Sequence, residues 1–255
     1  MAEQGRRYVA LDFGAESGRT IVGTIADDKL TVEPVHRYPN VPVRMGGTLY
    51  WDFPRMFGDL LDGMRKVSAE GPVHSVSVDT WGVDYGYLDA RGRLIGNPVH
   101  YRDTRHETMP DEAFEVIPRD ELYMATGIQH MSINTIFQML SEVKTNDPIL
   151  GQADRFLMMP DLFNHFLCGV DVCEYTEATT GQTVDPWTRD WARPLLERLE
   201  IPTHFLPEIV QPGTELGTLL NEVADATGCK GARVIAGASH DTPSAVAATP
   251  LASPS

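Results

Sequence analysis

The first forty residues predict three short strands joined by two tight turns, and this feature limits the fold more than any other. Tyr8–Phe13 is a compact apolar run that ends in a turn signal, and Thr20–Ile25 is rich in residues that favour strands. Asp27 and Asp28 mark the second turn, after which Leu30–Tyr38 continues as an extended segment. Two tight hairpins in succession imply an antiparallel meander at the start of the chain.

Strands and helices alternate after the meander. A helix is expected to begin near Asp52, which stands at an N-cap position before Pro54, and to end before Gly71. This alternation places the chain in the α/β class. The other elements that the patterns predict are strands at Val73–Val78, Val83–Leu88 and Arg233–Ala238, and helices at Ile133–Val143, Asp161–Leu167, Trp191–Leu199 and Pro243–Ala248, the last with Thr242 as N-cap.

Composition narrows the classes of partner. The chain has 255 residues and a formal net charge of −15, with 42% hydrophobic and 22% charged residues, as in a globular protein of one large or two small domains. The acidic balance argues against nucleic acid and anionic membranes as partners, but it allows a small anion to bind at a locally suited site. No apolar run approaches the roughly 20 residues of a membrane helix, and the N-terminus lacks the apolar core of a secretory leader.

The cysteines indicate a reducing compartment. The chain has an odd number of cysteines, Cys168, Cys173 and Cys229, and they form no C-x-x-C pair. This pattern predicts a cytoplasmic protein without a disulfide framework. The histidines show no H-E-x-x-H motif and no zinc-type spacing with cysteine. A dedicated transition-metal site is therefore not expected.

The segment DFGAESGRT, between the first two predicted strands, is the first candidate for chemistry. Gly14 and Gly18 allow positive φ and close approach of a ligand, and the intervening N–H groups with the Ser17 hydroxyl could form a nest for phosphate. Arg19 adds positive charge, and Asp12 at the strand end could hold hydrated Mg²⁺. The alternative is a plain hairpin turn, since neither the Walker A nor the G-x-G-x-x-G pattern is present.

A second candidate, DTWGVDYG at Asp79–Gly86, begins where a buried strand is expected to end. Two carboxylates, an indole and a glycine suit a polyol, because sugars present both hydroxyl groups and an apolar face. A strand-to-turn junction around a core tryptophan explains the same residues. The mixed charges of His100–Arg105 suggest a solvated turn unless that loop folds toward this second candidate.

A third candidate, Ser239–Thr242, follows the last predicted strand. Asp241 would lie at the carboxyl end of that strand beside a helix N-terminus, a position suited to a general base. A Ser/His/Asp triad is a weaker alternative, because adjacent residues on one loop seldom converge and no G-x-S-x-G elbow is present. A plain helix cap is the remaining interpretation.

Four segments in sequence order resemble the rhamnulokinase branch of the FGGY carbohydrate kinases. They are VALDFGAESGRTIVG at Val9–Gly23, YWDFPRMFGDLLDGM at Tyr50–Met64, DTWGVDYGYLDARGRLIGNPVHYRDTR at Asp79–Arg105 and SHDTPSAVAA at Ser239–Ala248. The third is the most discriminating, because a general actin-like ATPase would not need it. Together they cover nearly the whole chain.

The resemblance implies an actin-like, ribonuclease-H-like ATPase fold, with a mixed sheet that starts with the meander and is flanked by helices. It implies an N-terminal kinase domain at 1–248, with 249–255 as a tail or as the start of a missing C-terminal domain. That second domain would supply the adenine pocket and the other wall of the cleft. We therefore expect a truncated kinase that is nearly inactive by itself.

The resemblance also implies a reaction, in which L-rhamnulose and ATP give L-rhamnulose 1-phosphate and ADP, with Mg²⁺. Asp241 would accept the proton of the sugar hydroxyl, and Asp12 would lie near the Mg²⁺-bound phosphates. A non-catalytic sugar-binding or regulatory module and an actin-like ATPase without a sugar substrate remain alternatives. The ketose contacts implied are Gly82, His240, Asp241 and Thr242, and the ATP contacts are Ala15, Glu16, Ser17, Gly18 and Arg19.

Overall fold

A mixed six-stranded sheet organises the computed structural model, which describes residues 5–250. The strand order is β13-β14-β6-β1-β2-β3. Strands β1, β2 and β3 form the predicted antiparallel meander, whereas β6 runs parallel to both β1 and β14. The bounds are β1 Arg6–Phe13, β2 Ser17–Ala26, β3 Lys29–Pro39, β6 Ser75–Asp79, β13 Thr214–Thr218 and β14 Arg233–Ala236.

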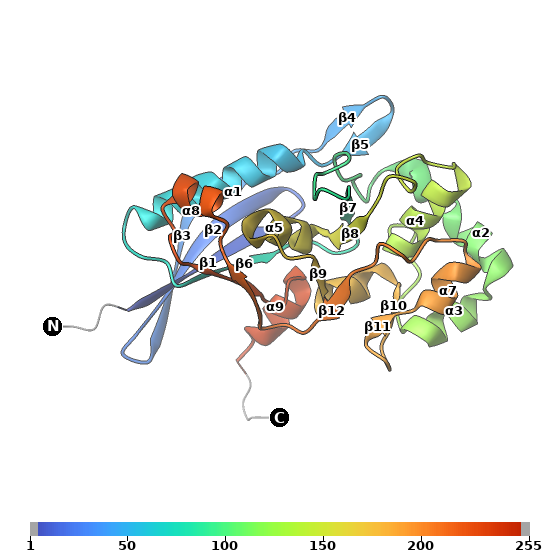
Figure 1. Cartoon of the computed structure of the whole chain (residues 1–255). Helices are drawn as coiled ribbons and strands as arrows, with labels where there is room; N and C mark the ends of the chain where they lie inside the picture. The colour runs from blue at the N-terminus through green and yellow to red at the C-terminus, as the bar shows by residue number, and fades with distance from the viewer. Residues whose placement is uncertain (1–4, 251–255) are drawn as a thin grey trace.

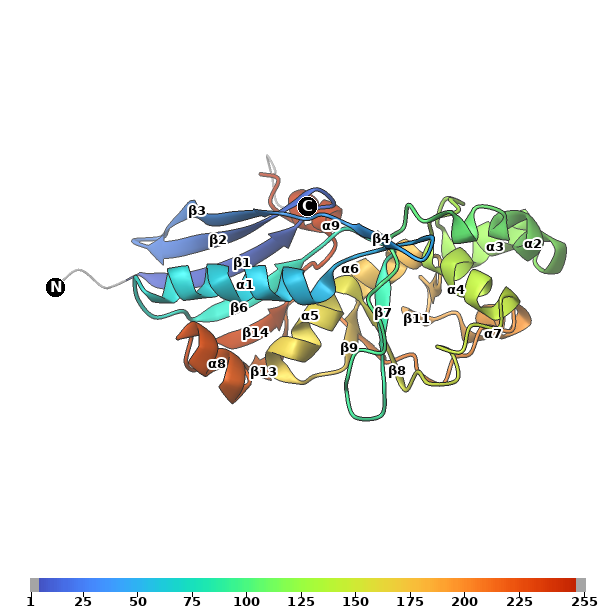
Figure 2. The same cartoon turned by 90° about the horizontal axis from the view of Figure 1, so that it is seen from above.

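Three helices cover one face of this sheet (Figures 1 and 2). Helix α1 (Phe53–Ser68) begins where the sequence predicts, because the Asp52 carboxylate accepts a hydrogen bond from the Arg55 N–H and Pro54 occupies the first turn. Gly63 brings this helix close to β2, since a Cβ there would lie 1.9 Å from the Thr20 hydroxyl oxygen. The other two helices are α5 (Met159–Cys168) and α8 (Asn221–Thr227). We call the sheet with these helices the sheet body.

A second region lies beyond one end of the sheet and has a hydrophobic cluster of its own (Figure 2). We call it the lobe. The hairpin of β7 (Tyr85–Leu88) and β8 (Arg155–Met158) separates the two clusters and is buried on both faces. The other elements of the lobe are η1 Thr104–His106, α2 Met109–Val116, α3 Arg119–Thr126, α4 Thr135–Lys144, β9 Val172–Glu174, α6 Tyr175–Ala178, η2 Thr179–Gly181, β10 Val184–Asp185, β11 Asp190–Trp191, α7 Arg193–Arg198 and β12 Glu208–Val210.

Two elements remain outside these regions. The small hairpin of β4 (Val43–Met45) and β5 (Thr48–Tyr50) projects beyond α1, and α9 (Asp241–Ala247) lies on the face of the sheet opposite α1 (Figure 1). Helix α9 begins two residues earlier than the sequence predicts, with His240 rather than Thr242 as N-cap. The expected tail at 249–255 falls mostly outside the described residues. No helix within 5–250 is long and apolar enough to cross a membrane.

Candidate active site

Three carboxylates come together at the carboxyl end of the parallel strands. Asp12 of β1 lies opposite Asp79 of β6 in the strand register. The Thr80 N–H donates to the Ser239 carbonyl and the Asp241 N–H donates to the Thr80 carbonyl, both at 2.9 Å, so the segment after β14 continues the sheet. This backbone pairing brings Asp241, the predicted base, beside Asp79.

Burial and nearby charges both act on the carboxyl group of Asp79. Burial is the main cause that raises the pKa of Asp79 to about 7, while the nearby Asp12 and Asp241 contribute less and Arg19 opposes the shift. The Arg19 guanidinium pairs with the Asp12 carboxylate. Asp79 belongs to the segment whose pattern suits either a polyol or a strand-to-turn junction, and the structure places its carboxylate between the two others.

Oxygen ligands of this kind suit Mg²⁺, which is usually bound through one or two carboxylates and the phosphates of a substrate. Within the described part of the chain, no three His, Cys, Asp or Glu side chains converge closely enough to hold a metal by themselves. Asp12 and Asp79 therefore fit a partial magnesium site that is completed by phosphate oxygens and water. Asp12 and Asp241 add a smaller contribution to the raised pKa of Asp79, and a cation would relieve this part of the shift.

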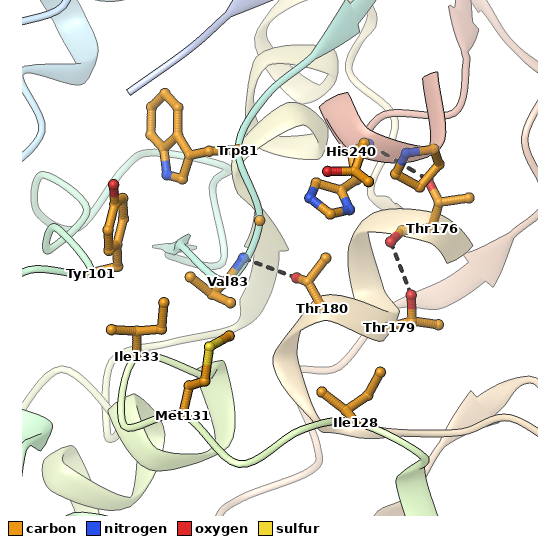
Figure 3. A pocket seen from close by; sticks show the side chains of 13 residues that line it. Trp81, Val83, Tyr101, Ile128, Met131, Ile133, Thr176, Thr179, Thr180 and His240 are labelled. Carbon is orange, nitrogen blue, oxygen red and sulfur yellow. Dashed lines mark hydrogen bonds between the residues drawn. The ribbon is translucent and has the colours of Figure 1, made fainter. Parts of the chain in front are cut away.

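A pocket of about 520 Å³ opens next to this end of the sheet (Figure 3). Its walls come from the junction after β6, from the loop before α4, from α6 and η2, and from the start of α9. Of the four predicted ketose contacts, Gly82, His240 and Thr242 line it, and Asp241 stands between the latter two in the chain. The complete lining is Trp81, Gly82, Val83, Tyr101, Ile128, Met131, Ile133, Thr176, Thr179, Thr180, His240, Thr242 and Pro243.

Asp84 holds the aromatic wall of the pocket in place. Its fully buried carboxylate accepts hydrogen bonds from Trp81 Nε1 at 2.9 Å, Trp51 Nε1 at 2.6 Å, Gln138 Nε2 at 3.1 Å and the Tyr101 N–H at 3.2 Å. Burial raises the pKa of Asp84 to about 6, although these four donors oppose the shift. Asp84, one of the two carboxylates of the second candidate, is therefore a structural anchor, and the His100–Arg105 loop does fold toward that candidate.

Val83 has a backbone conformation that β-branched residues rarely adopt, with φ of +73°. Three hydrogen bonds from the lobe maintain it. The Val83 N–H donates to Thr180 Oγ1 at 2.9 Å, and the Val83 carbonyl accepts from Thr135 Oγ1 at 2.7 Å and Gln138 Nε2 at 3.2 Å. Gly82 allows this turn to pass over Thr180, because a Cβ at Gly82 would lie 2.8 Å from the Thr180 methyl carbon.

A buried glutamate ties the lobe to the segment that carries the predicted base. Glu174 Oε2 accepts hydrogen bonds from the Ser239 N–H at 3.0 Å and Ser239 Oγ at 2.7 Å, and the same carboxylate accepts from the N–H and hydroxyl of Thr176. Glu174 and Ser239 are fully buried. The Ser239 hydroxyl is thus committed to Glu174, which removes the support for a Ser/His/Asp triad.

His240 and Asp241 face one another at the pocket. His240 Nε2 lies 3.3 Å from Asp241 Oδ1, and the Asp241 side chain is 49% exposed. Burial lowers the pKa of His240, although Asp241 and Glu174 act in the opposite direction. A neutral imidazole can both donate and accept a hydrogen bond, as recognition of a sugar hydroxyl requires.

The predicted phosphate loop is the turn between β1 and β2. Ala15 and Glu16 lie in the turn, whereas Ser17, Gly18 and Arg19 belong to β2. Neither Gly14 nor Gly18 has positive φ, so this part of the prediction is wrong. Gly18 is needed for another reason, since a Cβ there would lie 2.1 Å from a ring carbon of Tyr38.

Several pocket residues were missed by sequence reasoning. The threonines of EYTEATTG, at Glu174–Gly181, form one wall of the pocket, and their clustering was the only available signal. Ile128, Met131 and Ile133 gave no signal, because a short apolar loop resembles core. Of the two tryptophans that flank the polar turn at 188–190, Trp191 is buried and Trp187 is 88% exposed.

Comparison with known proteins places the chain in a family. Residues 7–248 match the model of the FGGY family of carbohydrate kinases, N-terminal domain. The rhamnulokinase of Bacteroides thetaiotaomicron is 39% identical over 246 residues, which cover 96% of this chain and 51% of the relative. That of Bacillus subtilis is 34% identical, with 95% of this chain and 50% of the relative covered. The chain thus spans about half the length of these relatives.

Solved structures share the fold at low sequence identity. A gluconate kinase from Lactobacillus acidophilus superposes with a TM-score of 0.84 at 17% identity, covering 93% of this chain and 48% of that one. A carbohydrate kinase from Novosphingobium aromaticivorans gives 0.80 at 24% identity, covering 96% and 50%. These likenesses confirm the predicted actin-like fold. The family match over nearly the whole chain shows that it belongs to the FGGY family of carbohydrate kinases.

Proposed function

We propose that this chain forms the sugar-binding and phosphate-binding half of an ATP-dependent ketose kinase that phosphorylates the 1-hydroxyl of L-rhamnulose. The observation that carries the proposal is the position of Asp241, between a pocket of sugar size and the carboxylates Asp12 and Asp79. The rhamnulokinase names of the relatives support the choice of sugar. We further propose that residues 1–248 act as one domain and that the protein works in the cytoplasm, where ATP is available.

Asp241 is the proposed general base. Its half-exposed carboxylate can reach a hydroxyl group bound at His240 and Thr242, whereas Asp79 and Asp84 are held by the fold. Asp241 accepts the proton of the 1-hydroxyl while that oxygen bonds to the γ-phosphorus of ATP. The bond from the γ-phosphorus to the bridging oxygen breaks, and its electron pair leaves with ADP. Positioning and charge stabilisation dominate such transfers.

The β1–β2 turn is the proposed site of the terminal phosphates, with contacts from Ala15 to Arg19. It lies next to Asp12, which follows from the pairing of Asp12 with Arg19 across β1 and β2. Asp12, with Asp79 beside it, would hold a hydrated Mg²⁺ that neutralises charge on the phosphates. Arg19 would then exchange its contact with Asp12 for a phosphate oxygen.

The remaining contacts would come from a second domain that corresponds to the other half of the relatives. Correct positioning of two reactants can contribute about 7–11 kcal/mol to the barrier. We therefore expect the 255-residue chain to bind ketose weakly and to release ADP at a rate close to background.

The test is a coupled ADP-release assay on the purified chain and on the chain fused to the remaining half of the Bacteroides thetaiotaomicron relative. Sugar-dependent ADP release from the fusion, with preference for L-rhamnulose over glycerol, is the expected result. Robust release from the chain alone would contradict the need for a second half. Ketose binding without release in the fusion would instead favour a non-catalytic sugar-binding module.

A further inference from the structure

The pocket beside Asp241 has two chemically different sides (Figure 3). Thr176, Thr179 and His240 lie on one side, with Thr242 at the start of α9. The opposite side consists of Trp81, Tyr101, Met131 and Ile133, and Ile128 lies below in the view of Figure 3. A ligand of sugar size would therefore meet hydroxyl and imidazole groups at one end and carbon and sulfur atoms at the other.

The carbonyl groups of the three pocket residues in the loop at residues 128–133 are already engaged inside the protein. The Ile128 carbonyl accepts from Gln182 Nε2 at 3.0 Å, the Met131 carbonyl from the Asn134 N–H at 3.0 Å and the Ile133 carbonyl from Gln138 Nε2 at 2.9 Å. These contacts direct the carbonyl groups into the lobe. What the loop presents to the pocket is the side chains of two isoleucines and a methionine.

The neighbouring polar groups on this side are also engaged. Trp81 Nε1 donates to Asp84, and the Val83 carbonyl accepts from Thr135 and Gln138. The Tyr101 hydroxyl points toward Trp81 rather than toward Met131 or Ile133 (Figure 3). A hydroxyl group on this end of a bound sugar would therefore lose contacts with water and meet mainly carbon and sulfur atoms.

The position of the base fixes the direction of the ligand. Asp241 lies in the chain between His240 and Thr242, so the hydroxyl that it deprotonates must lie at the polar end. The far end of a ketose then extends toward Ile128, Met131 and Ile133. We propose that these three residues form a subsite for a terminal methyl group, so that the chain prefers 6-deoxy ketoses to their 6-hydroxy counterparts.

This inference rests on the proposed function, because the direction of the sugar depends on Asp241 as the base. L-Fructose differs from L-rhamnulose only by a hydroxyl group on the sixth carbon, which makes it the matched probe. An apolar pocket rejects such an added hydroxyl by a factor that reaches roughly 100. We expect the purified chain to bind L-fructose about 10- to 100-fold more weakly than L-rhamnulose, measured by isothermal titration calorimetry.

Two variants place a polar group in the subsite, Met131→Gln with little change in volume and Ile133→Thr with the loss of one heavy atom. Met131→Gln and Ile133→Thr should each narrow the ratio of the two affinities by about 3-fold or more, since the sixth hydroxyl gains a partner. Met124→Gln is the matched control, because Met124 is 73% exposed on α3 and lies outside the pocket. Circular dichroism would confirm that each variant folds.

The outcomes separate the two proposals. Equal affinity of the unmodified chain for both sugars would overturn the methyl subsite and leave the kinase proposal standing. A ratio that stays unchanged in both folded pocket variants would overturn the assignment to Met131 and Ile133. Binding of neither sugar would overturn the proposed function and the subsite with it.

Discussion

The sheet body and the lobe contribute different chemistry to the same site. From the sheet body come the carboxylates Asp12 and Asp79, and backbone pairing with Thr80 places Asp241, at the start of α9, beside them. The lobe provides the threonine wall and the apolar loop of the pocket. Charges that suit phosphoryl transfer thus lie on the regular sheet or directly beside it, and the groups proposed to distinguish one sugar from another lie on irregular segments of the lobe.

The two regions also differ in how they are held. Paired strands fix the sheet body over long registers, whereas the lobe fixes the pocket through single buried side chains. Asp84 anchors the aromatic wall, and Glu174 joins the lobe to Ser239. Substitutions on the sheet should therefore affect the reaction, and substitutions at the buried anchors should affect the alignment of the two regions.

The largest expected effect is that of Asp241→Asn in the fusion with the second half of the relative. Loss of a general base lowers the rate by about 10²–10⁴, which corresponds to roughly 3–5 kcal/mol of barrier. Steady-state kinetics should show this fall in kcat with little change in ketose affinity. Asp225→Asn, at an exposed position of α8, is the control and should leave kcat unchanged. Near-normal turnover in the Asp241 variant would contradict its role.

Glu174→Gln tests the link between the regions. The amide would bring N–H groups against the N–H and hydroxyl donors of Ser239 and Thr176, so the free energy of unfolding should fall by about 1.5–3 kcal/mol. Ketose affinity should fall as well, because His240 follows directly after Ser239. Urea denaturation and calorimetry measure both effects, with the exposed Glu208→Gln of β12 as control. Equal behaviour of the two variants would show that the contact does not hold the regions together.

Alanine substitution at two glycines of β2 should change the free energy of unfolding in opposite directions. Gly18→Ala adds a methyl group that would overlap the buried Tyr38 ring, so it should lower the free energy of unfolding by about 1–3 kcal/mol. A Cβ at Gly23 would lie 3.4 Å from the exposed Leu30 side chain, which is an ordinary contact. Gly23→Ala should therefore raise the free energy of unfolding by up to about 1 kcal/mol, because alanine reduces the conformational freedom of the unfolded chain. Urea denaturation would measure both. Similar changes at the two positions would mean that Tyr38 accommodates the methyl group.

Asp79→Asn should stabilise the chain in a pH-dependent way. The pKa of Asp79 is about 7 in the fold and near 3.8 when unfolded, so below pH 4 both states are protonated and the aspartate has no penalty. As the pH rises toward 7, the unfolded state ionises first and the native state loses stability. The free energy of unfolding of the variant should therefore exceed that of the unmodified chain by about 1 kcal/mol at pH 8, allowing for screening by solvent, and by almost nothing at pH 4. Thermal denaturation across this range measures the gain, and a pH-independent difference would refute the assignment.

The sequence predicted the sheet body well because its signals are local. The alternation of strands and turns up to Tyr38 and the Asp52 cap with Pro54 each lie within a few residues of the element they define. The short helices α2, α3 and α8 were missed, since seven or eight residues give only two turns of apolar pattern. The start of α9 was misplaced because His240 caps it without a side-chain hydrogen bond.

The site itself could be predicted only in part. Motif resemblance identified Gly82, His240 and Thr242, all of which line the pocket. The positive φ of Val83 could not be foreseen, because Thr135, Gln138 and Thr180 maintain it and lie more than fifty residues away in the chain. The function of Glu174 likewise depends on Ser239, 65 residues later. Such contacts exist only after folding and leave no local pattern.

The strand order of the sheet has a consequence for the time course of synthesis. Strand β6 ends at Asp79, but its parallel partner β14 begins only at Arg233, which is 233 − 79 = 154 residues later. At about 5–20 residues per second, the ribosome needs roughly 8–30 s to supply that partner. During this interval Val76 and Val78 belong to an unpaired strand edge, the kind of surface that recruits other chains. The nascent chain is therefore most vulnerable to aggregation while the lobe is being synthesised, and this edge of β6 is covered only when β14 leaves the ribosome and pairs with it.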